Sequence, residues 1–200
     1  MPDPVIGRLL LITGASAAGK TIVGHEVASL LSRAVHIDGD AIQRFVVSGA
    51  VPMDVPPPPG AVEQLTLRYA AAMTVSSLYR RAGFDAVITD NVFEAHLTGL
   101  LFVAFADAPS EPVHVVVLDP PLEVIRKRYD TRPGGGYSDT ITPEALQEAV
   151  ARTPRIGLWL DNGHHTPAET AAEIVDRLDE TAVTQRELLV RVNAPERTTS

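Results

Sequence analysis

The chain has 200 residues, of which 45 % are apolar and 21 % charged, enough to bury the core of one domain with a small insertion. It lacks cysteine, which excludes disulfides and thiolate metal sites, and its formal net charge of −8 argues against general binding to nucleic acid. Because it shows neither a membrane-length apolar run nor a secretory leader, we expect a cytoplasmic protein with no membrane or nucleic-acid partner.

The first predicted elements are a buried strand over residues 7–13 and a helix over residues 19–32. The loop that joins them fits the pattern G-x-x-x-x-G-K-[ST] with Gly14, Ala15, Ser16, Ala17, Ala18, Gly19, Lys20 and Thr21. Because strand, loop and helix follow in this order, we interpret the loop as a nucleotide-binding P-loop rather than an incidental glycine turn.

Each residue type in this loop has a use in binding a triphosphate. Gly14 and Gly19 allow the backbone to curl so that successive N–H groups point at phosphate oxygens, and the helix N-terminus adds further donors. Lys20 is expected to reach the β- and γ-phosphates, and the Thr21 hydroxyl to bind Mg²⁺. The predicted cofactors are therefore ATP and Mg²⁺.

The next predicted strand, residues 34–38, ends at the sequence Asp38-Gly39-Asp40. Phosphoryl transfer requires a carboxylate near the attacking hydroxyl, so we expect Asp40 to act as the base and Asp38 to face Lys20 and Mg²⁺. A structural alternative is that Asp40 caps the predicted helix over residues 41–47, with Gln43 completing a capping box. The proline-rich segment of residues 48–60 follows and is expected to form a wall of the acceptor pocket.

Strand and helix patterns then alternate to the end of the chain. Strands are predicted over residues 85–90, 112–118 and 156–160, and helices over residues 61–82, 94–106, 120–129, 143–151, 167–178 and 185–192. Strands that are apolar throughout and alternate with helices indicate a three-layer α/β fold with a parallel sheet. Functional residues are then expected at the carboxyl ends of the strands.

Two further groups of charged residues are candidates for phosphate chemistry. Asp90 ends an apolar strand, as a Walker B carboxylate that binds Mg²⁺ does, although a capping role is the alternative. Arg128 and Arg132 share a helix face and are expected to neutralise charge during transfer, unless they form an exposed face paired with acidic neighbours. Glycines at 134–136 predict the hinge of a lid over about residues 126–142.

Together these residues resemble the chloramphenicol phosphotransferase-like branch of small P-loop kinases, near the shikimate, gluconate and adenylylsulfate kinases and the zeta toxins. The likeness spans about residues 9–178 and rests on the P-loop, the Asp-Gly-Asp sequence, residues 82–93 and the arginine-bearing helix. It implies a five-stranded parallel sheet in the order 2-3-1-4-5 and a catalytic aspartate at Asp40, or at Asp38 if the strand end is shifted. The chain departs from that pattern at residues 48–60 and 134–136, so the family's substrate does not carry over.

We therefore predict one kinase domain over residues 1–180, followed by a partly disordered extension over residues 181–200. The predicted activity is transfer of the γ-phosphoryl group of ATP to a hydroxyl of a small molecule, such as an antibiotic. Residues expected to contact that substrate are Asp40, Arg44, Met53 and Asn91. The acidic composition favours a neutral or cationic acceptor. Alternatives are a zeta-toxin-like sugar-nucleotide kinase, a polynucleotide kinase and a nucleotide-binding switch.

Overall fold

A 6-stranded sheet forms the centre of the computed structural model, which describes residues 6–131 and 140–192. Its strands are β1 (Leu9–Gly14), β2 (Ala34–Asp38), β3 (Asp85–Thr89), β4 (Val113–Leu118), β5 (Leu158–Leu160) and β6 (Ala182–Val183). The strand order is β2-β3-β1-β4-β5, and every neighbouring pair in it is parallel. The predicted α/β fold and strand order are therefore confirmed.

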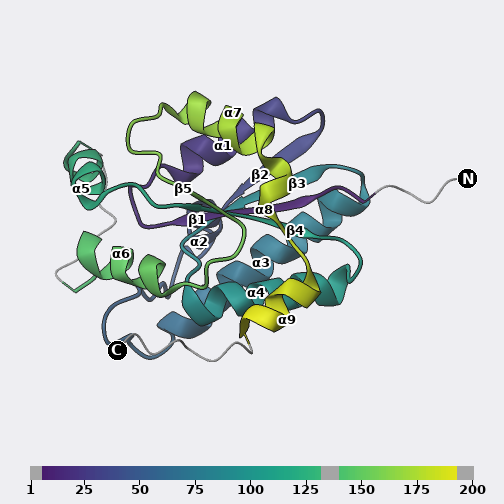
Figure 1. The fold of residues 1–200 in the computed structure, drawn as a ribbon. Helices are drawn as coiled ribbons and strands as arrows, with labels where there is room; N and C mark the ends of the chain where they lie inside the picture. Colours follow the sequence, from purple (N-terminus) through teal and green to yellow (C-terminus); the bar gives the residue numbers. More distant parts are fainter. Residues whose placement is uncertain (1–5, 132–139, 193–200) are drawn as a thin grey trace, which may run out of the picture.

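Helices cover both faces of the sheet, as strands with apolar residues on both sides require. In Figure 1, α1 (Lys20–Leu30) and α7 (Pro167–Asp176) lie on one face, and α3 (Ala61–Arg81), α4 (Glu94–Asp107) and α9 (Gln185–Val192) lie on the other. Side chains of β1 alternate between two buried clusters: Leu9 and Leu11 belong to one, Leu10 and Ile12 to the other. This alternation gives the domain one apolar core on each side of the sheet.

The remaining helices are α2 (Gly39–Gln43), α5 (Leu122–Asp130), α6 (Pro143–Arg152) and α8 (Leu178–Thr181). Two predicted helix starts are confirmed by their caps. The Thr142 side chain accepts a hydrogen bond from the Ala145 N–H, and Thr166 forms a capping box with Glu169. Both caps satisfy backbone N–H groups that a first helical turn leaves without partners.

The start of α2 differs from the prediction. The helix begins at Gly39, and its N-cap is Asp38, whose Oδ1 accepts from the Asp40 N–H at 3.3 Å. The alternative role of Asp40 as a cap completed by Gln43 is therefore wrong: Asp40 lies within the first turn, and Gln43 accepts a hydrogen bond from Arg68. The consequence is that the Asp40 carboxylate is not used to start the helix.

The C-terminal segment adds an element that the sequence did not reveal. Strand β6 pairs antiparallel with β4, so the predicted five-stranded sheet is one strand short. Two residues are too few to show a strand period. The predicted helix over 185–192 is confirmed as α9, and its Leu188 is fully buried in the core. The predicted lid glycines at 134–136 and the tail from residue 193 lie outside the described residues. Across residues 6–131 and 140–192, no helix is both long and apolar enough for a membrane span.

Candidate active site

The loop between β1 and α1 has the backbone geometry that a phosphate-binding loop needs. Gly14 and Gly19 have φ angles of 149° and 100°, and Ala17 also has a positive φ of 64°. A Cβ on Gly14 would lie 2.4 Å from the carbonyl oxygen of Leu118 on β4, so only glycine fits there. Ala15 and Ala18 are buried. The loop therefore curls tightly against the end of β4 before α1 begins.

Lys20 and Thr21 occupy the first turn of α1. The Lys20 ammonium donates to the Ala15 carbonyl at 2.8 Å, so the side chain reaches back along its own loop. Thr21 is exposed beside it. On the other side of the loop, the Asn91 amide donates to the Ser16 hydroxyl at 3.4 Å, which links the P-loop to the segment after β3.

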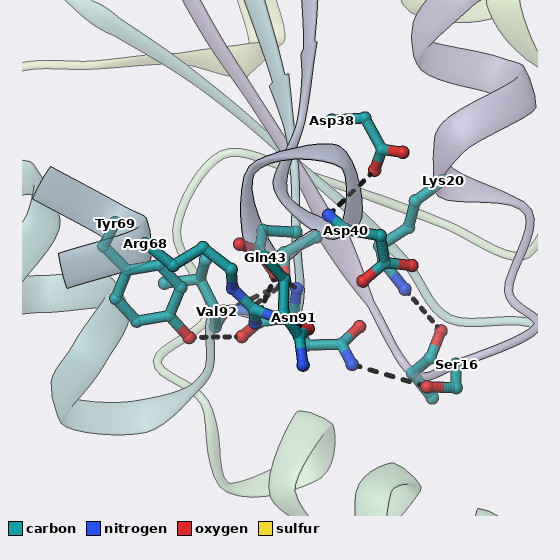
Figure 2. Close-up of polar contacts among 12 residues, drawn as sticks. Ser16, Lys20, Asp38, Asp40, Gln43, Arg68, Tyr69, Asn91 and Val92 are labelled. Atoms are coloured by element: carbon teal, nitrogen blue, oxygen red, sulfur yellow. Dashed lines mark hydrogen bonds and ion pairs between the residues drawn. The ribbon is translucent and has the colours of Figure 1, made fainter. Parts of the chain in front are cut away.

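The carboxylates of Asp38, the last residue of β2, and Asp40, in the first turn of α2, point in different directions. Figure 2 shows the Asp40 carboxylate on the same side as the Lys20 ammonium, while the Asp38 carboxylate turns to the Asp40 N–H at the start of α2. Asp40 is exposed, and Asp38 is half-buried. Both Lys20 and Asp40 are close enough to Asp90 to influence its ionisation. Asp40 is thus the carboxylate that the fold presents beside the P-loop lysine.

Asp90 is buried just after β3, and its Oδ1 is fully engaged. This oxygen accepts from Arg68 Nη2 at 2.7 Å and from the Asn91 N–H at 2.7 Å. Its Oδ2 is buried without a hydrogen-bond partner, and a Cβ on Gly39 would lie 2.0 Å from it. Burial raises the pKa of the Asp90 carboxyl, while Arg68, the Asn91 N–H and Lys20 oppose that shift.

Arg68 is the residue in this site that sequence reasoning missed. It lies on α3, and its Nη1 donates to Gln43 Oε1 on α2 at 2.6 Å while Nη2 contacts Asp90. One arginine in an ordinary helical pattern carries no sequence signal, because its partners lie on two other elements. Only the packing of α3 against the sheet brings the three side chains together.

Arg128 reaches the other side of the P-loop from α5. Its Nη1 donates to the Ala18 carbonyl at 3.1 Å and its Nη2 to the Asn162 carbonyl at 2.8 Å. The Asn162 amide also donates to Ala18, at 3.0 Å, so the segments after β1 and β5 meet here. Burial lowers the pKa of Arg128, and Asp161 opposes that shift. Arg132, its predicted companion, lies outside the described residues.

The proline-rich segment is held in place from two sides. Gln64 on α3 donates to the Gly49 carbonyl at 2.8 Å and accepts from the Val51 N–H at 2.9 Å. Asp54 accepts from the Thr140 hydroxyl, close to the start of α6. Met53, predicted to contact substrate, is half-buried in this segment. The segment is therefore packed between α3 and the residues that lead into α6.

The oxygen donors near the P-loop suit a magnesium ion held partly by phosphates and water. Within the described ranges, no three His, Cys, Asp or Glu side chains gather as a metal site of protein ligands alone would require. Thr21 is exposed on α1, and the Asp38 carboxylate is engaged only through Oδ1 among the hydrogen bonds of the described residues. A hydroxyl and a carboxylate are both oxygen donors of the kind that Mg²⁺ prefers. Asp90, in contrast, has one oxygen bonded and the other packed against Gly39.

Comparisons with known proteins agree with this geometry. A family model described as an AAA domain matches residues 9–155, and no curated protein matches the chain significantly. Among solved structures, the chain is similar to the Mycobacterium tuberculosis APS kinase in complex with AMPPNP and APS, with a TM-score of 0.66 and 20 % identity over 88 % of this chain and 99 % of that one.

Two other solved structures share the fold. An unliganded sugar kinase from Janibacter sp. has a TM-score of 0.63 and 22 % identity, covering 87 % of this chain and 95 % of that one. The tunicamycin resistance protein of Deinococcus radiodurans has a TM-score of 0.61 and 14 % identity, covering 88 % and 98 %. At these identities, the likeness shows a shared fold alone.

Proposed function

We propose that this chain, which belongs to the AAA domain family, is a kinase. The proposed reaction transfers the γ-phosphoryl group of ATP to a hydroxyl group of a small molecule. The family match runs from β1 to residue 155, just before β5, and so includes the P-loop, both aspartates after β2 and the arginines of α5. Kinases of small molecules are among the solved structures that share its fold.

One observation carries the proposal: the Asp40 carboxylate lies on the side of the Lys20 ammonium and is exposed (Figure 2). A loop that only bound nucleotide would need no open carboxylate beside its lysine. A kinase needs one, because the attacking hydroxyl must be oriented and must lose its proton as it reacts. The position of Asp40 therefore favours group transfer over nucleotide binding alone.

The residues then divide the reaction between them. Backbone N–H groups of the P-loop and the Lys20 ammonium bind the phosphates, and Asp40 accepts the hydroxyl proton. The hydroxyl oxygen forms a bond to the γ-phosphorus while the bond from that phosphorus to the β,γ-bridging oxygen breaks, leaving ADP. Arg128, which lies against Ala18 of the loop, adds positive charge at the phosphate site. Arg132, which lies outside the described residues, is proposed to share that role.

Magnesium would be held by Thr21 and Asp38, the oxygen donors that fit it. When bound, the ion neutralises charge on the β- and γ-phosphates. Asp90 is the third predicted magnesium ligand. Its Oδ1 already accepts two hydrogen bonds and its Oδ2 is packed against Gly39, so its role as a metal ligand stays a prediction.

The acceptor is proposed to bind between α2 and the proline-rich segment. Arg44, Met53 and Asn91 are the proposed contacts in addition to Asp40. Arg44 is exposed, and it takes part in none of the ion pairs found in the described part of the chain. Exposed apolar side chains at Phe45, Val47 and Val55 suit an acceptor with an apolar body. Hydroxylated antibiotics belong to this class, and one protein of similar fold is a tunicamycin resistance protein.

The direct test is a screen of hydroxylated metabolites and antibiotics for ADP release by the purified chain with ATP and Mg²⁺. The expected result is ADP release that depends on an added alcohol and yields its phosphate ester. ATP hydrolysis that ignores every alcohol and responds to a protein partner would instead support a nucleotide-binding switch. Phosphorylation of a sugar nucleotide or of a polynucleotide end would point to the other two alternatives.

The Asp40→Asn variant tests the base assignment. We expect phosphoryl transfer to fall by about 10²- to 10⁴-fold, because the amide does not accept the hydroxyl proton, while binding of a fluorescent ATP analogue stays within about twofold. Asp176→Asn, an exposed change at the end of α7, is the matched control. Turnover by Asp40→Asn equal to that of the control would remove Asp40 from the mechanism.

A further inference from the structure

An ion pair buried beneath the proposed acceptor site ties three elements together. Arg68 on α3 and Asp90 after β3 meet at 2.7 Å, with their side chains only 13 % and 3 % exposed. The second terminal nitrogen of Arg68 donates to Gln43 on α2 at 2.6 Å. Both ends of the guanidinium are therefore committed to protein partners, which leaves little of it to bind a substrate anion.

Asp90 also fixes the start of α2 by direct packing. Its Oδ2 fills the space where a Cβ on Gly39 would stand, at 2.0 Å from that position. Gly39 is the first residue of α2, and Asp40 is the second. The glycine of the Asp38-Gly39-Asp40 sequence is thus explained by the carboxylate behind it, because any side chain there would displace either Asp90 or the first turn of α2.

The contacts continue from Asp90 to the P-loop. The Tyr69 hydroxyl donates to the Asn91 carbonyl at 2.6 Å, and the Asn91 amide donates to Ser16 at 3.4 Å. Thr13 at the end of β1 exchanges hydrogen bonds with the backbone of Val92, both at 3.0 Å. Figure 2 shows this chain of contacts leading from α3 through the segment after β3 to the loop that holds Lys20.

We propose that Arg68 is a positioning residue: by holding Asp90 against Gly39 and binding Gln43, it fixes the first turn of α2, and with it Asp40, relative to the P-loop. This inference rests on the proposed function for its effect on transfer, and on geometry alone for its effect on α2. Asp40 is exposed, so its place depends on the helix that carries it. Arg68 connects that helix to the sheet.

The test removes the ion pair without leaving a buried charge alone. In Arg68→Met/Asp90→Asn both charges are lost and side-chain volume is nearly kept, and the matched control is Arg81→Met/Asp107→Asn, an ion pair at the far end of the same helix α3. We expect kcat for the alcohol to fall about 100-fold, the cost of misplacing a reacting group, with the affinity for a fluorescent ATP analogue unchanged. Amide hydrogen exchange within α2 should become faster. The control should change neither quantity.

Gln43→Leu, an exposed change, keeps the inference testable if the double variant does not fold. It removes only the hydrogen bond between Arg68 and Gln43 of α2. We expect about a tenfold loss in kcat and faster amide exchange in α2. It also touches no predicted metal ligand, so an unchanged magnesium requirement separates positioning from metal binding.

Unchanged exchange in α2, or unchanged kcat in an active enzyme, would overturn the inference. A loss of activity that appears only as a raised magnesium requirement would also overturn it, in favour of Asp90 as a ligand. If the wild-type chain transfers no phosphate to any alcohol, the proposed function fails on its own, and the exchange of α2 still decides whether Arg68 positions that helix.

Discussion

The P-loop and the proposed acceptor side differ in how far apart in the sequence their determinants lie. The P-loop is formed by consecutive residues between β1 and α1, and its shape follows from positive φ angles at Gly14, Ala17 and Gly19. The acceptor side is assembled from α2, α3 and the segment after β3, through pairs such as Arg68 with Asp90 and Gln64 with Gly49. The backbone shape of the P-loop can therefore be encoded locally, although Arg128 and Asn162 also contact Ala18 from outside it. The proposed acceptor side depends on tertiary contacts throughout.

Adding one methyl group to Gly14 should have the largest effect of the changes proposed here, because it alters the P-loop itself. A Cβ there would lie 2.4 Å from the Leu118 carbonyl, and φ is 149°. We expect Gly14→Ala to lower the affinity for ATP by at least about 100-fold and the free energy of unfolding by about 2–4 kcal/mol, because the loop must leave its place against β4. Calorimetric ATP titration and urea denaturation measure the two effects, and normal affinity would show that the loop shape is not needed.

The same methyl group at Gly39 should disturb the proposed acceptor side and leave the P-loop unchanged. It would meet Asp90 Oδ2 at 2.0 Å and shift the first turn of α2. We expect Gly39→Ala to lower transfer to the alcohol about 100-fold while ATP affinity stays within about threefold. Gly99→Ala is the control, because a Cβ there meets nothing within 4 Å and α4 is helical at that point. Equal losses of ATP affinity and transfer in Gly39→Ala would mean that the two regions are not independent.

Loosening the proline-rich segment should produce a smaller change. Gln64→Leu removes the hydrogen bonds to the Gly49 carbonyl and the Val51 N–H and keeps the charge of Arg68. We expect the KM for the alcohol to rise about fivefold to tenfold, since each lost hydrogen bond to the backbone weakens the wall of the pocket, while the KM for ATP stays constant. Steady-state kinetics with both substrates measure this. A rise confined to the KM for ATP would place the segment on the nucleotide side.

The smallest expected effect is a pH dependence of stability that arises at His114, outside both regions. Burial lowers the pKa of His114 on β4, where the ring lies 2.8 Å from the Thr181 hydroxyl. The folded state thus binds a proton at His114 more weakly than the unfolded state, in which His titrates near 6.5. The contribution of His114 to the free energy of unfolding is therefore fully present above that pH and is lost as the pH falls below it. We expect a lower midpoint of thermal unfolding at pH 5.5 than at 7.5, and a smaller difference in His114→Asn. An unchanged difference in that variant would assign the pH dependence to other groups.

The fold could be predicted from the sequence because its determinants are local and repeated. Strands that are mostly apolar on both faces indicate a covered parallel sheet, and caps such as Thr142 and Thr166 set the starts of helices within four residues. The P-loop, too, lies within one run of residues. The exceptions were short elements: β6 has too few residues for a pattern, and the cap of α2 is Asp38, whereas the sequence pattern had suggested Asp40.

The site was predicted only in part, because side-chain direction and partners depend on packing. The sequence identified Asp38 and Asp40 as a pair, but only the structure shows that Asp38 starts α2 and that Asp40 lies on the side of Lys20 (Figure 2). It identified Asp90 by its place after a strand, yet the partner, Arg68, comes from a helix 22 positions earlier in the chain. Charge on a helix surface gives no sign of such a partner.

By itself, the sequence determined the class of fold, the order of its elements and the position of the P-loop, since glycines, apolar runs and caps act on their own neighbours in the chain. Tertiary structure alone decided which carboxylate lies on the side of the P-loop lysine and which is buried against an arginine. The reason is physical: the ionisation and direction of a carboxylate are set by what surrounds it in space, and around Asp90 those surroundings come from α1, α2 and α3.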